Sequence, residues 1–205
     1  MINLVFCSVA MMVSANAFPE NRSEKETEAP FKLYKRDEWL AEPATDVEPL
    51  VTPVPYVVIH HTYIPGPCAT FEECTKSMRS MQSYHKSLDW GDIGYNFCVG
   101  GDGAVYEGRG WEVEGIHAGK ANSVSVGICL IGDWRTELPP KAQIETAKAL
   151  IEEGISKGYI KHNYKLVGHK QVRPTECPGQ TLYNLISKWE HFSPKFELPT
   201  KNVKH

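Results

Sequence analysis

Residues 56–62, YVVIHHT, are the stretch of sequence that decides the fold. The stretch is short, rich in β-branched residues, and apolar at consecutive rather than alternate positions. Such a run is typical of a strand that is covered on both faces, as in the centre of an α/β sheet. Because it ends in His60 and His61, it predicts a buried strand with two imidazoles at its carboxyl end.

Helix and hairpin signals follow this strand. Apolar residues recur every three or four positions from Phe71 to Leu88, and Thr70 and Glu73 occupy capping positions at the start. This spacing predicts an amphipathic helix. Two apolar runs separated by the Gly-Gly-Asp-Gly of residues 100–103 then predict a β-hairpin.

The C-terminal half continues the alternation of strands and helices. Residues 123–132, SVSVGICLIG, predict a buried strand, and residues 164–169, YKLVGH, predict a last strand that also ends in a histidine. A helix is predicted from the first-turn residue Pro140 to Gly158, and another over residues 181–192. Together these elements predict an α/β fold, a single domain with a central mixed β-sheet flanked by helices.

Composition and charge limit the classes of partner. The 205 residues are 41% hydrophobic and 23% charged, which is ordinary for a globular domain. The net charge of -3 gives no general attraction to nucleic acid or to an acidic membrane, so neither is expected as a partner. We expect a monomer whose ordered domain covers residues 31–193.

The N-terminal segment predicts the compartment. Residues 1–17, MINLVFCSVAMMVSANA, are apolar and end in Ala-Asn-Ala, which is typical of a secretory signal peptide. The segment is too short to span a bilayer. We therefore expect a secreted, extracellular protein with a flexible leader at 18–30 and a polar tail at 194–205.

The cysteines fit a secreted protein with one thiol left over. One of the six lies in the signal segment, so the mature chain has an odd number. Cys68 and Cys74 lie close together in GPCATFEEC and are predicted to form a disulfide. Cys98 and Cys129 lie in apolar runs and are predicted to be small buried core residues. Cys177 is the remaining thiol.

Histidines at two strand ends suggest a metal site. His60 or His61, together with His169 and Cys177, could supply the three protein ligands that a catalytic zinc takes. Successive strand residues face opposite ways, so only one of His60 and His61 can face a given site, and the residues alone do not choose between them. Ordinary buried or surface histidines and a free thiol are the alternative.

Four segments resemble the animal peptidoglycan-recognition proteins, which are similar in turn to the phage-type N-acetylmuramoyl-L-alanine amidases. They are YVVIHHT, the GDIGYNF and VGGDGAVYEGRGW of residues 91–111, HAGKANSVSVGICLIGDW of 117–134 and GHKQVRPTECPG of 168–179. The resemblance runs from about Phe31 to Phe192, and GDWRTELPP at 132–140 is similar to the insect secreted amidase branch. It implies the amidase and peptidoglycan-recognition fold.

The resemblance also implies a catalytic set. The first histidine of the pair, His60, the histidine of GH, His169, and the cysteine of CPG, Cys177, correspond to the family's ligands of a Zn²⁺ cofactor. Tyr95 corresponds to the family's active-site tyrosine. Thr175, two residues before the cysteine, corresponds to a position that lysine holds in the phage enzyme, and Tyr95 and Thr175 are the expected catalytic residues. Non-catalytic members commonly replace the cysteine, which this sequence keeps.

The implied partner is bacterial peptidoglycan and its muropeptides, cut between the lactyl group of N-acetylmuramic acid and L-alanine. Such cleavage destroys fragments that stimulate immunity. A receptor that binds without cutting, and a directly bactericidal protein, are the other classes considered.

The expected substrate-binding residues are Trp90, Arg109, His117 and Asn122. Trp90 and Arg109 resemble the residues at these positions in family members that prefer diaminopimelate stem peptides. Asp89, however, stands where glycine is usual in those members. A guanidinium can hold the extra carboxylate of diaminopimelate in a two-bond fork.

Overall fold

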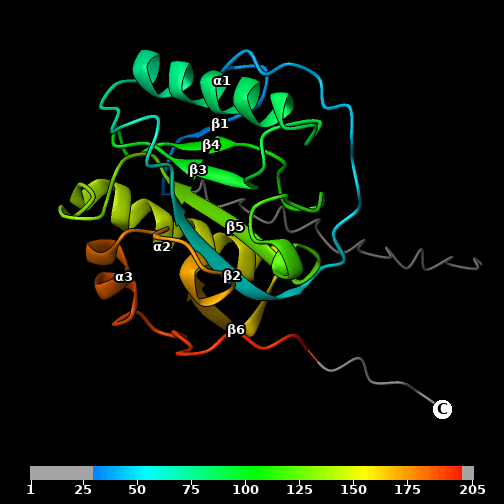
Figure 1. The fold of residues 1–205 in the computed structure, drawn as a ribbon, viewed down its shortest axis with the longest axis vertical. Coiled ribbons are helices and arrows are strands. Elements are labelled where there is room, and N and C mark those ends of the chain that lie inside the picture. Colours follow the sequence, from blue (N-terminus) through cyan, green and yellow to red (C-terminus); the bar gives the residue numbers. More distant parts are fainter. Residues whose placement is uncertain (1–29, 200–205) are drawn as a thin grey trace, which may run out of the picture.

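Strand β2 (Val54–His61) lies inside a six-stranded sheet with the order β1-β4-β3-β5-β2-β6 (Figure 1). All its residues except Pro55 are buried, and it pairs in parallel with β5 (Ser125–Leu130) on one side and β6 (Ile160–Gly168) on the other. The prediction of a strand covered on both faces is confirmed, because apolar side chains here pack above and below the sheet.

The structure is a computed structural model that describes residues 30–199. The predicted signal peptide at 1–17, nearly all of the predicted leader at 18–30 and the end of the predicted tail lie outside the described residues. Within 30–199, no helix is both long and apolar enough to cross a membrane.

The predicted hairpin supplies the antiparallel part of the sheet. Strands β3 (Phe97–Val99) and β4 (Val105–Glu107) pair antiparallel on either side of the glycine-rich turn. β3 continues in parallel with β5, and β1 (Leu33–Tyr34) lies parallel to β4 at the sheet edge. The sheet is therefore mixed, as predicted.

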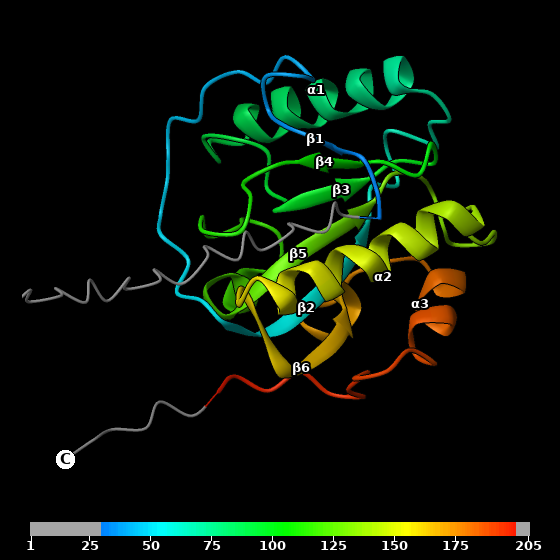
Figure 2. The same ribbon diagram turned by 180° about the vertical axis from the view of Figure 1, so that it is seen from behind.

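Helices cover both faces of the sheet (Figures 1 and 2). α1 (Phe71–Ser87) packs on one face, and α2 (Lys141–Ser156) and α3 (Gln180–Ile186) pack on the other. Two short 3₁₀ helices, η1 (Gly119–Val124) and η2 (His169–Gln171), flank the strand ends. The predicted α/β class, a single mixed-sheet domain flanked by helices, is confirmed.

Capping residues place the start of α1. The Thr70 hydroxyl accepts a hydrogen bond from the Glu73 backbone N–H at 3.3 Å, as an N-cap should. The Glu73 carboxylate accepts from the Ala69 N–H at 2.7 Å, so the reciprocal bond lies one residue earlier than in a standard capping box.

The buried stripe of α1 is narrower than predicted. Cys74, Met78 and Met81 are buried, whereas Tyr84 is 62% exposed and Leu88 is 42% exposed. Polar Gln82 and His85 lie in the buried part of this face instead. Tyr84 is therefore left on the surface beside the groove described below.

The two C-terminal helices end earlier than predicted. α2 ends at Ser156, and Gly158, with φ of 77°, allows the left-handed turn that leads into β6. α3 ends at Ile186 rather than continuing to residue 192. The chain instead turns back to the sheet, because the Leu166 N–H donates to the His191 carbonyl at 2.8 Å.

The first residues after the predicted domain end pack on the body of the protein. The Phe196 ring lies 4.9 Å from the Tyr56 ring, and the Tyr56 hydroxyl donates to the Glu197 carbonyl at 2.8 Å. Phe196 thus packs on the face of the sheet that η1 also covers, and Glu197 is bonded to the same face.

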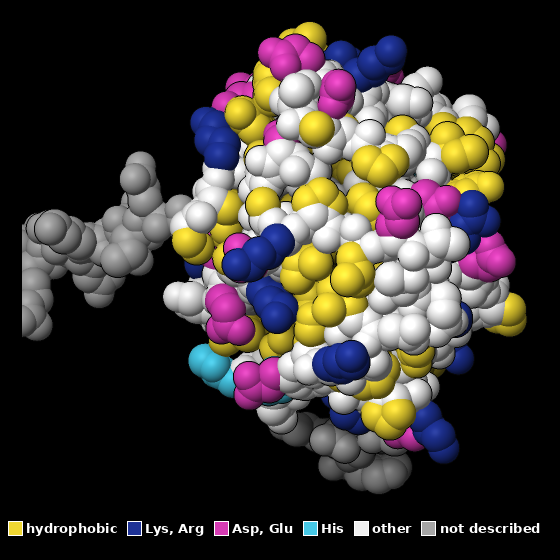
Figure 3. Space-filling view, turned by 90° about the vertical axis from the view of Figure 1, so that its left-hand side faces the viewer, with side chains coloured by type: hydrophobic (Ala, Val, Ile, Leu, Met, Phe, Trp, Pro, Cys, Tyr) yellow, Lys and Arg dark blue, Asp and Glu magenta, His cyan; other side chains and the backbone are white. Residues whose placement is uncertain are grey.

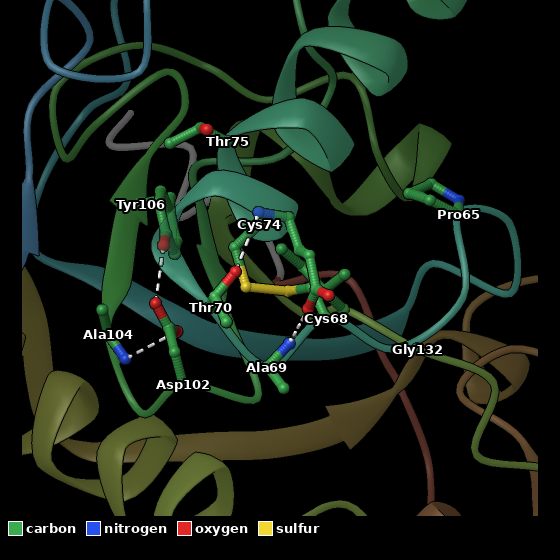
Figure 4. The surroundings of a disulfide bond; sticks show 12 residues. Pro65, Cys68, Ala69, Thr70, Cys74, Thr75, Asp102, Ala104, Tyr106 and Gly132 are labelled. Carbon is green, nitrogen blue, oxygen red and sulfur yellow. Dashed lines mark hydrogen bonds between the residues drawn. A yellow bond between two sulfur atoms is a disulfide. The ribbon is translucent and has the colours of Figure 1, made fainter.

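The predicted disulfide is confirmed. Cys68 and Cys74 are bonded, which ties the loop after β2 to the first turn of α1 (Figure 4). Cys98 and Cys129 are buried free cysteines on neighbouring strands, and Cys177 is a half-buried free cysteine. Each cysteine of the described chain therefore has the state that the sequence predicts.

Replacing Cys68 and Cys74 together by serine should lower the free energy of unfolding by about 2 kcal/mol, because a short loop is no longer closed in the unfolded state. Urea denaturation measures this loss. Reduced wild type is the control and should match the double variant. Equal stability of the oxidised wild type and the double variant would contradict the prediction.

Candidate metal centre and groove

The pairing of β2 with β6 brings two histidines together. Ile59 pairs with Gly168, so the next residues, His60 and His169, leave neighbouring parallel strands at the same edge. Their ring centroids are 4.5 Å apart. The position follows from topology, because parallel strands present their carboxyl ends together.

Cys177 reaches this edge from the loop that follows η2. Its Sγ lies 3.6 Å from His60 Nδ1 and accepts the His61 backbone N–H at 3.4 Å. One nitrogen of each histidine, His60 and His169, and the cysteine sulfur all lie within 4.8 Å of one another. The structure thus brings His60, His169 and Cys177 together.

The structure chooses between the two adjacent histidines. His60 faces His169 and Cys177, whereas the His61 side chain turns to the other side and its Nδ1 accepts the Trp134 backbone N–H at 3.1 Å. The alternation of side chains along a strand is the physical reason.

His117 supports His60 from behind. Its Nδ1 lies 3.0 Å from His60 Nε2, and the two rings meet edge to face at 87°. Gly127 on β5 makes room for this, since a Cβ there would lie 2.5 Å from the His117 ring. Asn122 fixes the loop by accepting the backbone N–H groups of His117 and Ala118 at 3.1 and 2.7 Å.

Burial keeps the imidazoles of this cluster neutral. It lowers the pKa of His60 well below its ordinary value, that of His169 to about 4 and that of His117 to about 3. Neutral imidazole is the form that binds a metal. His169 Nε2 is buried and has no hydrogen-bond partner among the described residues.

The Cys177 thiol is also suited to bind a metal. Burial raises the pKa of Cys177 to about 12, although the His61 N–H lowers it in part. A buried thiol among neutral imidazoles becomes a thiolate when a cation compensates its charge. Two nitrogens and one sulfur form a donor set that suits Zn²⁺ with one position open.

Tyr95 and Thr175 lie beside this cluster. The half-buried Tyr95 ring is 5.2 Å from the His60 ring, and burial raises the pKa of the Tyr95 phenol, which therefore keeps its proton. The Thr175 hydroxyl oxygen accepts the Cys177 backbone N–H at 3.2 Å, and this bond does not use the hydroxyl proton.

Three hollows meet at Tyr95, and each is lined by a different set of residues. The first, about 560 Å³, lies between residues 62–65 and α1. The second, about 400 Å³, contains Cys177, His169, Thr175 and Arg135. The third, about 350 Å³, is lined by His85, Trp90, Ile116, His117, Gly119, Asn122, His169 and Arg173 as well as Tyr95. His169 lines both the second and the third hollow and Cys177 lines the second, so the metal-ligand cluster borders these two arms of the groove, and Tyr95 is shared by all three.

Trp90 and Arg109 take different places at the far end of the third hollow. Trp90 lines it and stacks on His85 at 4.6 Å. Arg109 is 7% exposed and lies behind the wall, where its guanidinium donates to the carbonyls of Trp90, Ile93 and Glu114 at 2.6, 2.8 and 3.2 Å.

Asp89, which stands where the family usually has glycine, has φ of 61°. Asp tolerates this left-handed conformation better than most residues, so the turn before Trp90 forms without glycine.

Several groove residues were not predicted from the sequence, and His85, Arg173 and Tyr63 are among them. His85 had a usable signal, because it lies four residues after Met81 on the inner stripe of a predicted amphipathic helix. Arg173 and Tyr63 lie in loops, and no spacing marks a loop residue as part of a groove that forms only on folding.

The fold and site together define an amidase-fold protein with a His-His-Cys cluster beneath a branched groove. A sequence profile described as N-acetylmuramoyl-L-alanine amidase matches residues 50–180. Peptidoglycan-recognition protein LB of Drosophila melanogaster is 54% identical over 163 residues, which cover 79% of this chain and 70% of that protein. The chain belongs to the peptidoglycan-recognition protein family.

Solved structures agree with this assignment. A mutant of Drosophila PGRP-LB in complex with tracheal cytotoxin is 54% identical, with a TM-score of 0.78, covering 78% of this chain and 96% of that one. Peptidoglycan recognition protein-LE in complex with tracheal cytotoxin, described as monomeric diaminopimelic acid-type peptidoglycan, is 40% identical with a TM-score of 0.77, covering 78% and 95%.

A substitution at Gly127 tests whether His117 holds the His60 ring in place. Gly127→Ala should displace the His117 ring and raise the Kd for Zn²⁺ by about tenfold or more, the usual effect of losing a residue that holds a ligand. Zn²⁺ titration against a competing chelator measures the Kd. Gly66→Ala, where an added Cβ has nothing within 4 Å, is the control and should bind like wild type. Equal affinity of both variants would refute the role of His117.

Proposed function

We propose that the protein is a secreted, zinc-dependent N-acetylmuramoyl-L-alanine amidase that acts on bacterial peptidoglycan. The observation that carries the proposal is the cluster of His60, His169 and Cys177 beside two arms of the groove. A protein that only binds peptidoglycan needs the groove but has no need of three converging metal-ligand side chains. Membership of the family supports the same activity.

His60, His169 and Cys177 would hold the zinc, and His117 would keep the His60 ring in place. When bound, zinc lowers the pKa of a water molecule to about 7 and polarises an amide carbonyl. These are the two requirements of amide hydrolysis, since an amide needs both a strong nucleophile and relief of the charge that develops on its oxygen.

Tyr95 and Thr175 supply hydrogen bonds to the reacting groups. Because the Tyr95 phenol keeps its proton, it can donate to the oxygen of the lactyl carbonyl as negative charge develops there. Thr175 has a hydroxyl proton free for a second bond from the side of Cys177. Preorganised donors of this kind typically contribute about 10²- to 10³-fold in rate each.

The third hollow is proposed to hold the stem peptide. Asn122 and Arg173 line it, and the positive charge of Arg109 behind the wall helps to lower the pKa of both His85 and His117, after burial as the main cause. Arg173 in the lining and Arg109 behind the wall are both cationic, and this charge favours carboxylates at this end. This supports a preference for diaminopimelate, which has one carboxylate more than lysine.

The predicted signal peptide at 1–17 supports secretion. In the extracellular space, cleavage of the lactyl–L-alanine bond would separate peptide from glycan and remove immune-stimulating fragments. We propose that the protein in this way scavenges muropeptides and down-regulates innate immune signalling. The surface in Figure 3 mixes acidic and basic side chains, and neither sign dominates that face. A face of mixed charge gives no general attraction to a charged polymer, so recognition of small muropeptides is assigned to the groove.

Mass spectrometry of defined muropeptides tests the reaction and the bond together. Wild type should release the intact stem peptide from N-acetylmuramic acid, and a chelator should abolish this. Cys177→Ser should lose at least about 10³-fold in kcat/KM while keeping its unfolding temperature close to wild type, because it removes a ligand and little volume. Full activity of Cys177→Ser, or of chelated protein, would rule out the mechanism.

Stem preference is tested with two substrates that differ only at the third residue of the peptide. The kcat/KM for the diaminopimelate peptide should exceed that for the lysine peptide, by about tenfold if one extra carboxylate is recognised. A separate incubation of live bacteria with the same enzyme concentration tests the alternative, a bactericidal role. Equal kcat/KM on the two peptides would overturn the preference.

A further inference from the structure

Arg173 has a guanidinium that no other part of the described chain uses. Of the arginines in residues 30–199, it alone makes no side-chain hydrogen bond and no ion pair. The others donate to carboxylates or to backbone carbonyls, namely Arg36, Arg79, Arg109 and Arg135. The Arg173 side chain is exposed and lines the third hollow. Its N–H donors, five in a fixed fork, are therefore available to a ligand.

Arg173 also carries the only full charge in the lining of the third hollow. No Asp, Glu or Lys is among the described residues that line it. Burial lowers the pKa of His85 to about 4, so His85 is neutral, as the other histidines of the lining are. A single uncompensated cation favours an anionic ligand over a neutral one.

A second polar group of the same hollow lacks a partner in the protein. His117 Nε2 is buried and has no hydrogen-bond partner among the described residues, although its Nδ1 lies 3.0 Å from His60 Nε2. Buried polar atoms are normally paired, so an unpaired one in the wall of a hollow indicates that a polar ligand binds there. The third hollow thus suits a ligand that is both polar and anionic.

Arg173 lies at the end of the third hollow that adjoins the metal-ligand cluster. Its backbone N–H donates to the carbonyl of His169 at 3.3 Å, in the turn that η2 forms after β6. Trp90 and Arg109 lie at the far end, where the Arg109 guanidinium donates to the Trp90 carbonyl at 2.6 Å. Two cations therefore belong to two different positions along the hollow.

The stem peptide presents carboxylates at two such positions. Counted from the lactyl amide, L-alanine is the first residue, D-glutamate the second, and diaminopimelate or lysine the third. D-glutamate is joined to the third residue through its γ-carboxyl group, so its α-carboxyl group projects from the chain. This group is a carboxylate in D-glutamate and a neutral amide in D-isoglutamine. An extended chain advances about 3.5 Å per residue, so the second residue stays near the metal-ligand cluster while the third reaches further along the hollow.

We propose that Arg173 is a specificity-determining residue, which binds the α-carboxylate of D-glutamate at the second position of the stem. The assignment rests on the proposed function for its substrate. A guanidinium holds a carboxylate through two parallel hydrogen bonds. The amide of D-isoglutamine has one acceptor oxygen, and its NH₂ group would face the N–H donors of Arg173. Stems with D-glutamate therefore bind more tightly than stems with D-isoglutamine, whichever residue is third.

Binding of four free stem tripeptides tests the assignment without any cleavage. The peptides combine D-glutamate or D-isoglutamine at the second position with diaminopimelate or lysine at the third, and calorimetry measures each Kd. For wild type, the Kd of a D-isoglutamine peptide should exceed that of the matching D-glutamate peptide by about tenfold, because a charge-assisted bond at an exposed group is lost. The free peptides have no lactyl amide, so the result does not depend on amidase activity.

Two substitutions of Arg173 separate its role from that of the far end of the hollow. Arg173→Gln should bring the Kd values for D-glutamate and D-isoglutamine peptides within about twofold of each other. It should leave the ratio between diaminopimelate and lysine peptides at the wild-type value. Arg173→Lys keeps the charge but loses the fork, so its preference for D-glutamate should lie between those of wild type and Arg173→Gln.

Lys170→Gln is the matched control, because it removes one positive charge from the same loop. Lys170 Nζ bonds the Gln180 side chain at 2.9 Å, and Lys170 lines none of the three hollows. It should keep the wild-type preference. The assignment is overturned if wild type binds none of the peptides or does not prefer D-glutamate, if Arg173→Gln keeps the preference or alters only the third-residue ratio, or if Lys170→Gln loses the preference equally.

Hydrolysis gives a second readout in the active enzyme. The ratio of kcat/KM for a muropeptide with D-glutamate to that for one with D-isoglutamine should exceed one in wild type and fall toward one in Arg173→Gln. An unchanged ratio in Arg173→Gln would refute the role of Arg173 while leaving the amidase intact. Absence of hydrolysis in wild type would instead refute the proposed function, which the binding of free peptides does not test.

Discussion

The register between β2 and β6 is the constraint on which the site depends. Pairing of Ile59 with Gly168 places His60 beside His169, and a shift of one residue would turn His60 to the other face of the sheet. The register is set by burial, since Val57, Ile59 and Leu166 share the core under α2 and α3. Packing on the face under α2 and α3 thus fixes which side chains form the metal-ligand cluster on the other face of the sheet.

This arrangement concentrates polar groups where burial is costly. His60 and His117 are almost fully buried, and their nitrogens partner each other at 3.0 Å. Such groups stay neutral because charging them without solvent is unfavourable. The same burial that makes the site hard to build keeps its imidazoles in the form that a metal requires. Gly127 is the enabling residue, because any side chain there would occupy the place of His117.

Much of the fold was predictable from local patterns. The buried run at 56–62, the hairpin turn at 100–103 and the cap at Thr70 each act through neighbours in sequence, and all three are confirmed. The end of α3 was not predictable, since the apolar spacing continues to Trp189 while a contact with β6 turns the chain away. Helix ends set by a distant strand leave no local signal.

For the site, the sequence by itself determined the residue types, namely two strand-end histidines, a leftover cysteine and, through family resemblance, their candidate roles. The local residue pattern could not choose between His60 and His61, because both satisfy it, and only the family resemblance indicated His60. The sequence also contained no sign of the place of Arg173 in the third hollow or of the buried position of Arg109. The tertiary structure decided these points, since the direction of a side chain and the walls of a groove depend on strand register and on residues far apart in the chain.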